Sequence, residues 1–174
     1  LVLPGRFIAT AEEHGLMAPL TTFVLTEAVR WCRRWRIAGS PLSVSVNLSI
    51  ATLSDVTYPD TVADLCASHD VGPGEVVFEL TESALARDST VLLDIVTRLR
   101  LKGFRLSIDD FGSGYSSLEQ LRSLPFTELK LDQHLIRDAA RDERSRLILR
   151  NSLDLARRLK MTTVAEGVEP QADL

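Results

Sequence analysis

The sequence predicts an α/β fold with a mainly parallel sheet. Short segments rich in Val, Ile, Leu and Phe alternate with longer segments of helical periodicity, and Gly, Pro or Ser bound most of the short ones. No repeat of fixed period predicts a solenoid or a propeller. With 174 residues the chain is long enough to bury a sizeable core, and we expect one domain over residues 1–174.

Five segments are predicted as strands because each is short, apolar and bounded by turn residues. They are Leu42–Ser49, Val76–Ser83, Phe104–Asp110, Glu128–Asp132 and Thr162–Glu169. Apolar residues at helical spacing predict helices over Thr21–Arg36, Asp88–Lys102 and Asp142–Lys160. We expect Thr21 or Thr22 to cap the first helix, Gly103 to end the second, and the arginines of the third to form a solvated outer face.

Charge and hydropathy exclude two classes of protein. Lys and Arg number 20 against 24 Asp and Glu, so the formal net charge is −4 and the isoelectric point is near 5.4. A protein that binds nucleic-acid polymers usually carries a basic footprint, which this composition lacks. No apolar run approaches the ~18 residues that cross a membrane, so we expect no direct membrane span.

The cysteines and histidines predict neither a disulfide framework nor a zinc site. Cys32 and Cys66 are expected to be two reduced thiols of a cytosolic protein. The three histidines match no metal-ligand spacing and are expected to be structural or exposed. They are His14, His69 and His134.

Alternation along the strands brings one polar side chain to the carboxyl end of each. Because residues two apart share a face of a strand, each strand has an aliphatic face and a face with one ionic or amide group. These five residues are Asn47, Glu79, Asp109, Lys130 and Glu166. Ligands of parallel α/β folds bind beyond the carboxyl ends of the strands, so we expect the five to form one site.

Carboxylates that converge on one point repel each other and favour a bound cation. Lys130 supplies one positive charge, and carboxylate and amide oxygens without His or Cys favour a hard ion such as Mg²⁺, Mn²⁺ or Ca²⁺. At the end of a strand, Asp110 could also face the site and join a pair of ions. Two ions held in this way suit the attack of water on a phosphodiester, with Lys130 holding the water or stabilising charge.

The loop from Phe111 to Ser117 has two readings. Gly112 and Gly114 flank Ser113, so the backbone amides could cradle a phosphate, and the position after the paired aspartates makes the loop a candidate lid or switch. Alternatively, the glycines serve only a turn that needs positive φ.

Several runs resemble the EAL-domain family of bacterial cyclic di-GMP phosphodiesterases over essentially the whole chain. They are VNLS (46–49), FELTES (78–83), IDDFGSGYSSL (108–118), LKLD (129–132) and VAEGVE (164–169), together with Phe7-Ile8, Ala11-Glu12 and Gly15-Leu16. The resemblance implies a modified TIM (β/α)₈-type barrel that hydrolyses cyclic di-GMP to linear pGpG in bacterial signalling. It also implies that the reaction uses two divalent ions, either Mg²⁺ or Mn²⁺.

The resemblance also implies a role for each matching residue. Asn47, Glu79 and Asp109 are expected to hold the first ion, Asp110 the second. Glu166 is expected to be a further carboxylate of the metal centre, and Lys130 to engage the catalytic water. Glu82 is similar to the glutamate that anchors the switch loop and couples dimer contacts to the active site. That loop contains Phe111, Gly112, Ser113, Gly114, Tyr115 and Ser116; Glu169 is an outer residue behind the site.

The family further implies a homodimer that is fused to, or regulated by, a sensor or GGDEF-type cyclase domain. We expect a cytoplasmic domain, with a parent protein that could be tethered to a membrane. The family's Glu-Ala-Leu motif, whose glutamate binds metal, and its late Gln-Gly motif are not in this sequence. A full barrel needs roughly 250 residues, so we expect a domain truncated at both ends and little activity from these residues alone. The alternatives are a sensor that binds cyclic di-GMP without cleaving it and a protein-interaction module.

Overall fold

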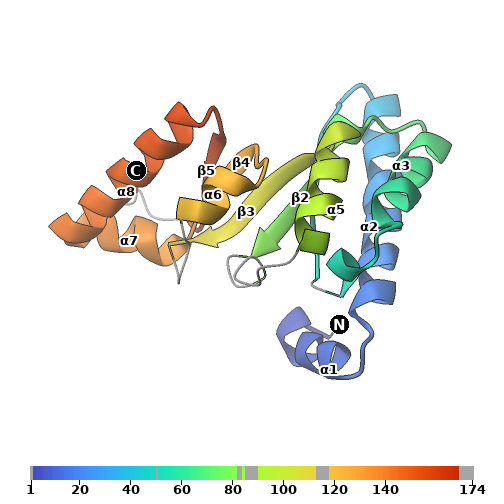
Figure 1. Cartoon of the computed structure of the whole chain (residues 1–174), viewed down its shortest axis with the longest axis horizontal. Coiled ribbons are helices and arrows are strands. Elements are labelled where there is room, and N and C mark those ends of the chain that lie inside the picture. The colour runs from blue at the N-terminus through green and yellow to red at the C-terminus, as the bar shows by residue number, and fades with distance from the viewer. Residues whose placement is uncertain (1, 50, 82–83, 85–89, 113–117, 169–174) are drawn as a thin grey trace. The chain divides into compact units, whose positions relative to one another are not determined.

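The computed structural model of the chain (Figure 1) describes residues 2–49, 51–81, 84, 90–112 and 118–168. They fall into two compact units. The first unit covers Leu1–Phe78 and Ser89–Phe104, and the second covers Glu79–Asp88 and Arg105–Leu174.

The strands form a five-stranded sheet in the order β1-β2-β3-β4-β5. Their bounds are Val44–Asn47, Val76–Thr81, Arg105–Phe111, Glu128–Leu131 and Thr162–Ala165. Each strand overlaps one predicted segment, and the pairs β3–β4 and β4–β5 are parallel, which confirms the predicted α/β fold. The predicted segments ran too far at three carboxyl ends, because Leu48, Asp132 and Glu166 lie just beyond β1, β4 and β5.

The first unit contains most of the helices that precede β3. They are α1 (Ile8–Glu13), α2 (Met17–Ile37), α3 (Tyr58–Ser68) and α5 (Thr90–Leu101), with short 3₁₀ turns over Pro4–Arg6, Thr52–Ser54 and Pro73–Glu75. Helix α5 buries Leu92, Ile95, Val96 and Leu99, four residues of its predicted apolar stripe, and ends before Gly103 as predicted. The sequence did not predict α3, which buries Val62 and Cys66.

Helix α2 starts earlier than predicted. It begins at Met17, so Thr21 and Thr22 lie inside the helix and the predicted cap is wrong. The N-cap residue is Leu16, whose side chain makes no capping hydrogen bond. The buried stripe runs through Thr21, Leu25, Val29 and Cys32 at helical spacing. Trp31 lies beside this stripe and is 46% exposed, so the apolar stripe of the sequence is wider than the buried one.

In the second unit, β3, β4 and β5 lie side by side, with α6 (Leu118–Ser123), α7 (Gln133–Arg141) and α8 (Glu143–Arg158) (Figure 1). Two aspartates cap helices: Asp132 accepts a hydrogen bond from the His134 amide, and Asp142 accepts one from the Ser145 amide. Arginines of α8 such as Arg144 and Arg150 are exposed, as predicted.

The core of this unit consists of aliphatic side chains on β3 and β4. Leu106, Ile108, Leu129 and Leu131 are at most 1% exposed. Burying each such side chain stabilises the fold by about 1.5–3 kcal/mol, so these residues hold the two strands in one register. The carboxyl ends of the strands are thereby placed together. Within the described ranges, no helix combines the length and the apolar character needed to span a bilayer.

Both cysteines are free and buried, in α2 and α3. Burial raises the pKa of the Cys66 thiol to about 11, and burial also raises the pKa of Cys32. Both thiols therefore stay protonated and inaccessible at pH 8.

We expect the native chain to react very slowly with a thiol reagent such as DTNB at pH 8, and both cysteines to react at once in guanidinium chloride. The absorbance of the released thiolate measures this directly. Fast labelling of one thiol in the native chain would contradict the buried packing of α2 and α3.

Candidate functional site

Lys130 lies among three carboxylates at the carboxyl ends of the strands of the second unit. Its Nζ atom is 3.0 Å from Oε1 of Glu79, 2.8 Å from Oδ1 of Asp109 and 2.6 Å from Oε1 of Glu166. The Lys130 side chain is only 14% exposed. Burial lowers the pKa of Lys130, but hydrogen bonds to Asp109, Glu166 and Glu79 outweigh burial and raise it. Lys130 therefore remains a charged hydrogen-bond donor.

Each of these side chains reaches the cluster from a strand end. Glu79 lies on β2, Asp109 on β3 and Lys130 on β4, while Glu166 follows β5 and its amide donates to the Leu131 carbonyl at 3.1 Å. These four were predicted to converge because of their parity, and the structure brings them together. Glu79 is 7% exposed on its side chain and Glu166 is 32% exposed, so the cluster opens toward solvent at Glu166.

A β-bulge turns the second aspartate toward the same site. Ile108 pairs with Leu129 and Phe111 with Leu131, so Asp109 and Asp110 together oppose Lys130. Asp110 has φ of +56°, the left-handed region that Asp enters more readily than most residues. In a regular strand, Asp110 would point to the opposite face. The bulge therefore allows two consecutive carboxylates to serve one site.

Carboxylate oxygens of Asp109, Asp110 and Glu166 all lie within 4.8 Å of one another. At that separation, two full charges repel by roughly 3–4 kcal/mol at an effective dielectric constant of about 20. Burial raises the pKa of Asp110, and the charges of Asp109, Asp132 and Glu166 raise it further, although Lys130 opposes them. One ammonium group leaves the cluster with an excess of negative charge.

The donor set fits a hard divalent cation. All three groups offer oxygen, which Mg²⁺, Mn²⁺ and Ca²⁺ prefer, and oxygens around one Mg²⁺ at ~2.1 Å are themselves about 3–4 Å apart. No histidine or cysteine belongs to the group among the described residues. The three carboxylates are therefore suited to hold such an ion after small side-chain rotations.

Other predicted site residues are not tested by these contacts. Asn47 ends β1 in the first unit and is exposed, so its part in the cluster stays a prediction. Phe111 is buried and Gly112 has φ of +98°. The remaining predicted residues lie outside the described part of the chain: Glu82, Ser113, Gly114, Tyr115, Ser116 and Glu169.

Asp132 is a site neighbour for which the sequence predicted no role. Its side chain is buried at the start of α7, where it accepts the His134 amide at 2.8 Å, and its charge raises the pKa of Asp110. The signal was present: an aspartate directly after an apolar strand precedes Leu135, Ile136 and Ala139 at helical spacing, which is typical of an N-cap.

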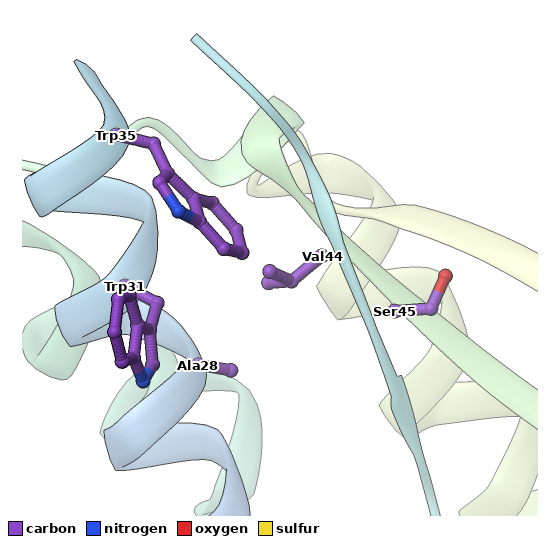
Figure 2. A pocket seen from close by; sticks show the side chains of 5 residues that line it. All are labelled: Ala28, Trp31, Trp35, Val44 and Ser45. Carbon is purple, nitrogen blue, oxygen red and sulfur yellow. The ribbon is translucent and has the colours of Figure 1, made fainter. Parts of the chain in front are cut away.

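Among the residues that the structure describes, no second group of carboxylates lies close enough together to form a comparable site. At the amino ends of β3 and β4, Glu128 is paired with Arg105 at 2.8 Å, a one-to-one ion pair that leaves no excess charge. In the first unit, a shallow apolar hollow of about 370 Å³ lies between α2 and β1 (Figure 2). Its lining contains no titratable side chain: Ala28, Trp31, Trp35, Val44 and Ser45.

Comparisons of the sequence with a family model and with known proteins agree on one family. The family model described as "EAL domain" matches residues 1–174. The bifunctional diguanylate cyclase/cyclic di-GMP phosphodiesterase MucR of Pseudomonas aeruginosa is 38% identical over 173 residues, which are 99% of this chain and 25% of MucR. The cyclic di-GMP phosphodiesterase PdeR of Escherichia coli is 36% identical over 169 residues, 97% of this chain and 26% of PdeR. The chain thus spans about a quarter of the length of these relatives.

Solved structures similar to this chain belong to the same family. The PaMucR phosphodiesterase in complex with c-di-GMP superposes with a TM-score of 0.90 at 38% identity, over 99% of this chain and 70% of that one. The EAL enzyme Bd1971, bound to cAMP and cyclic di-GMP, gives a TM-score of 0.91 at 25% identity, over 99% of this chain and 48% of that one. EAL domains have a TIM-barrel-like fold, which confirms the predicted fold class.

Replacing Lys130 by Met should destabilise the chain by about 3 kcal/mol, because it leaves poorly solvated carboxylates without their cation. Urea unfolding followed by circular dichroism measures the loss. Lys102→Met is the matched control, since Lys102 pairs with Asp60 at 2.7 Å on a solvated surface and should cost little. Equal stability of the Lys130→Met chain and the parent would contradict the charge balance described above.

Two replacements of Asp110 isolate the backbone strain at the bulge. Both Asp110→Gly and Asp110→Ala remove the carboxylate, but only Ala keeps a Cβ in the left-handed conformation, so Asp110→Gly should be more stable by about 1 kcal/mol.

The same pair at Asp138, an exposed position inside α7, should give the opposite sign by about 1 kcal/mol, because Ala favours a helix over Gly. Urea midpoints of the four variants provide the comparison. The same sign at both positions would show that Asp110 is not held at positive φ in solution.

Proposed function

This chain belongs to the EAL domain family, and we propose that it is the catalytic part of a cyclic di-GMP phosphodiesterase that hydrolyses cyclic di-GMP to linear pGpG. The single observation that carries the proposal is the Lys130 ammonium among carboxylates from three strand ends, with Asp110 turned toward the same point. Relatives that are cyclic di-GMP phosphodiesterases, such as PdeR, support it, as does the similarity to the PaMucR phosphodiesterase in its c-di-GMP complex.

We assign the metal-binding role to oxygen ligands only. Asp109, Asp110 and Glu166 would hold a divalent cation, and Asn47 and Glu79 would complete the ligands of a pair of Mg²⁺ or Mn²⁺ ions. When bound, such ions neutralise phosphate charge and make water more acidic. The oxygen-only donor set and its excess negative charge support this assignment.

Lys130 has the geometry of a group that orients water. Its Nζ atom donates to three carboxylates in this structure, and an exchange of one of these partners for a water molecule would place that water beside the ligands. The water oxygen would then form a bond to phosphorus while one phosphodiester P–O bond breaks, a carboxylate would accept the proton of the water, and the departing ribose oxygen would take up a proton from solvent and become a hydroxyl group of the linear product. Glu166 suits the role of this carboxylate because its side chain is the most exposed of the three.

The proposal also covers the regulation of the domain and its partners. Glu82 would anchor the loop from Phe111 to Ser117, which would couple a homodimer contact to the site, and Glu169 would support the site from behind. The bifunctional MucR, of which this chain spans 25%, supports an accompanying sensor or GGDEF-type cyclase domain. Residues 1–174 would form part of one EAL-type domain. A cyclic dinucleotide substrate and two free thiols both suit the cytoplasm.

The proposal is tested by incubating the protein with cyclic di-GMP and Mg²⁺ or Mn²⁺ and measuring both pGpG and bound nucleotide. The 174-residue chain and a longer form of the same protein are assayed together, because the chain spans 70% of the PaMucR phosphodiesterase structure. We expect metal-dependent cleavage by the longer form. Binding without cleavage would favour a sensor, and neither would favour an interaction module.

Asp109→Asn in the longer form should abolish metal-dependent cleavage and leave the fold intact, because Asp109 lies at a strand end and not among the buried aliphatic residues. Asp138→Asn, at an exposed position on α7, is the matched control and should keep full activity. Wild-type turnover in the Asp109→Asn form, measured as pGpG released, would overturn the assignment of the metal site.

A further inference from the structure

The first turn of α7 contacts both acidic strand ends of the second unit. Gly112 follows the Asp109–Asp110 bulge, and a Cβ atom placed there would lie 2.9 Å from Cδ2 of Leu135. Gly167 follows Glu166, and a Cβ atom placed there would lie 2.6 Å from Cβ of Gln133. Both glycines have positive φ, +98° and +64°. The two chain segments therefore cross the same helical turn, and the closer approach, at Gly167, leaves no room for a Cβ atom beside that of Gln133.

These contacts begin where the β-ladder ends. The last pairs of the ladder are Phe111 with Leu131 and Leu131 with Ala165. Past them, the Asp132 amide donates to the Phe111 carbonyl at 3.2 Å, and the Glu166 amide donates to the Leu131 carbonyl at 3.1 Å. Beyond those two hydrogen bonds, the described contacts that fix these segments are the ion pairs of Lys130 with Asp109 and Glu166 and the packing against α7.

Glu166 depends most on this packing. Its side chain is 32% exposed, against 7% for Glu79 and 13% for Asp109, so surrounding side chains restrict its position less than theirs. Its backbone lies between one ladder hydrogen bond and Gly167, whose closest approach to a side chain is to Gln133. The N-cap at Asp132 in turn fixes Gln133 relative to β4.

We propose that Gln133, at the first position of α7, is a positioning residue that sets the place of Glu166 through its contact with Gly167, and so sets the separation of the carboxylates that bind the cation. This rests on the proposed function, because it assumes a cation at the cluster. Gln133 itself need not touch the ion or the substrate.

The test is a double-mutant cycle read out by Mn²⁺ affinity, measured from the electron paramagnetic resonance signal of free Mn²⁺ with the longer form of the protein used in the activity assay. Gly167→Ala should lower the affinity about tenfold, the size of effect seen when groups that orient metal ligands are changed. Adding Gln133→Gly should restore most of it, because the Cβ atom of residue 133 is the obstacle.

Two controls separate positioning from a general loosening of the helix. Gln133→Ala keeps the Cβ atom, which makes the closest contact, so in the Gly167→Ala background it should restore much less affinity than Gln133→Gly. His134→Gly lowers helix propensity at the adjacent exposed residue and should restore nothing. Urea unfolding of every variant confirms that the affinities refer to folded chains.

The outcomes are distinguishable. If the protein without substitutions binds no Mn²⁺, the metal site of the proposed function is overturned, and this proposal falls with it. If that protein binds Mn²⁺ and the Gly167→Ala variant binds it equally well, only the positioning role is overturned. Recovery by Gln133→Ala or His134→Gly as large as that by Gln133→Gly would also overturn it, since the Cβ contact would then not be the cause.

Discussion

The balance of charge around Lys130 is the constraint on which the second unit depends. Three carboxylates lie within 3.0 Å of a single, poorly exposed ammonium group. Unpaired charges in such a place would cost several kcal/mol each, so the strands that carry them cannot shift in register without breaking the arrangement. The aliphatic residues of β3 and β4 fix the same register from the other end of the strands. Packing and electrostatics thus favour one alignment of the sheet.

The positive charge of Lys130 does not neutralise all the carboxylates around it, and the remaining negative charge is what suits the site to a cation. One lysine cannot neutralise Glu79, Asp109, Asp110 and Glu166, whereas Arg105 neutralises Glu128 at the opposite strand ends. A protein selected only for stability would pair each buried carboxylate once. The amino ends of the strands follow that rule and the carboxyl ends depart from it, which agrees with the position of ligand sites in parallel α/β folds.

Much of this arrangement could be predicted from the alternation of residues along strands. Parity placed Glu79, Asp109, Lys130 and Glu166 on one side, because side chains two apart share a face. Parity could not predict the bulge that brings Asp110 to that side, since the bulge depends on how β3 pairs with β4. Nor did it predict α7: its apolar positions are few, and its start is set by the Asp132 cap, a contact between side chain and backbone.

Unusual backbone conformations occur at the same place. The described residues with positive φ divide into two groups. Five of them come two residues after the last residue of a helix, where a left-handed residue ends helices routinely: Gly15, Gly39, Asp70, Gly103 and Lys160. The other three are Asp110, Gly112 and Gly167, and they lie at the carboxyl ends of β3 and β5. No helix cap explains these three, and a Cβ atom added at either of the two glycines would meet the first turn of α7. Of the three, only Asp110 carries a Cβ atom and is strained at positive φ; the two glycines adopt this conformation without strain. Strained residues persist where the surrounding fold imposes them and concentrate at functional sites, so the strain at Asp110 and the excess of charge identify the same end of the sheet.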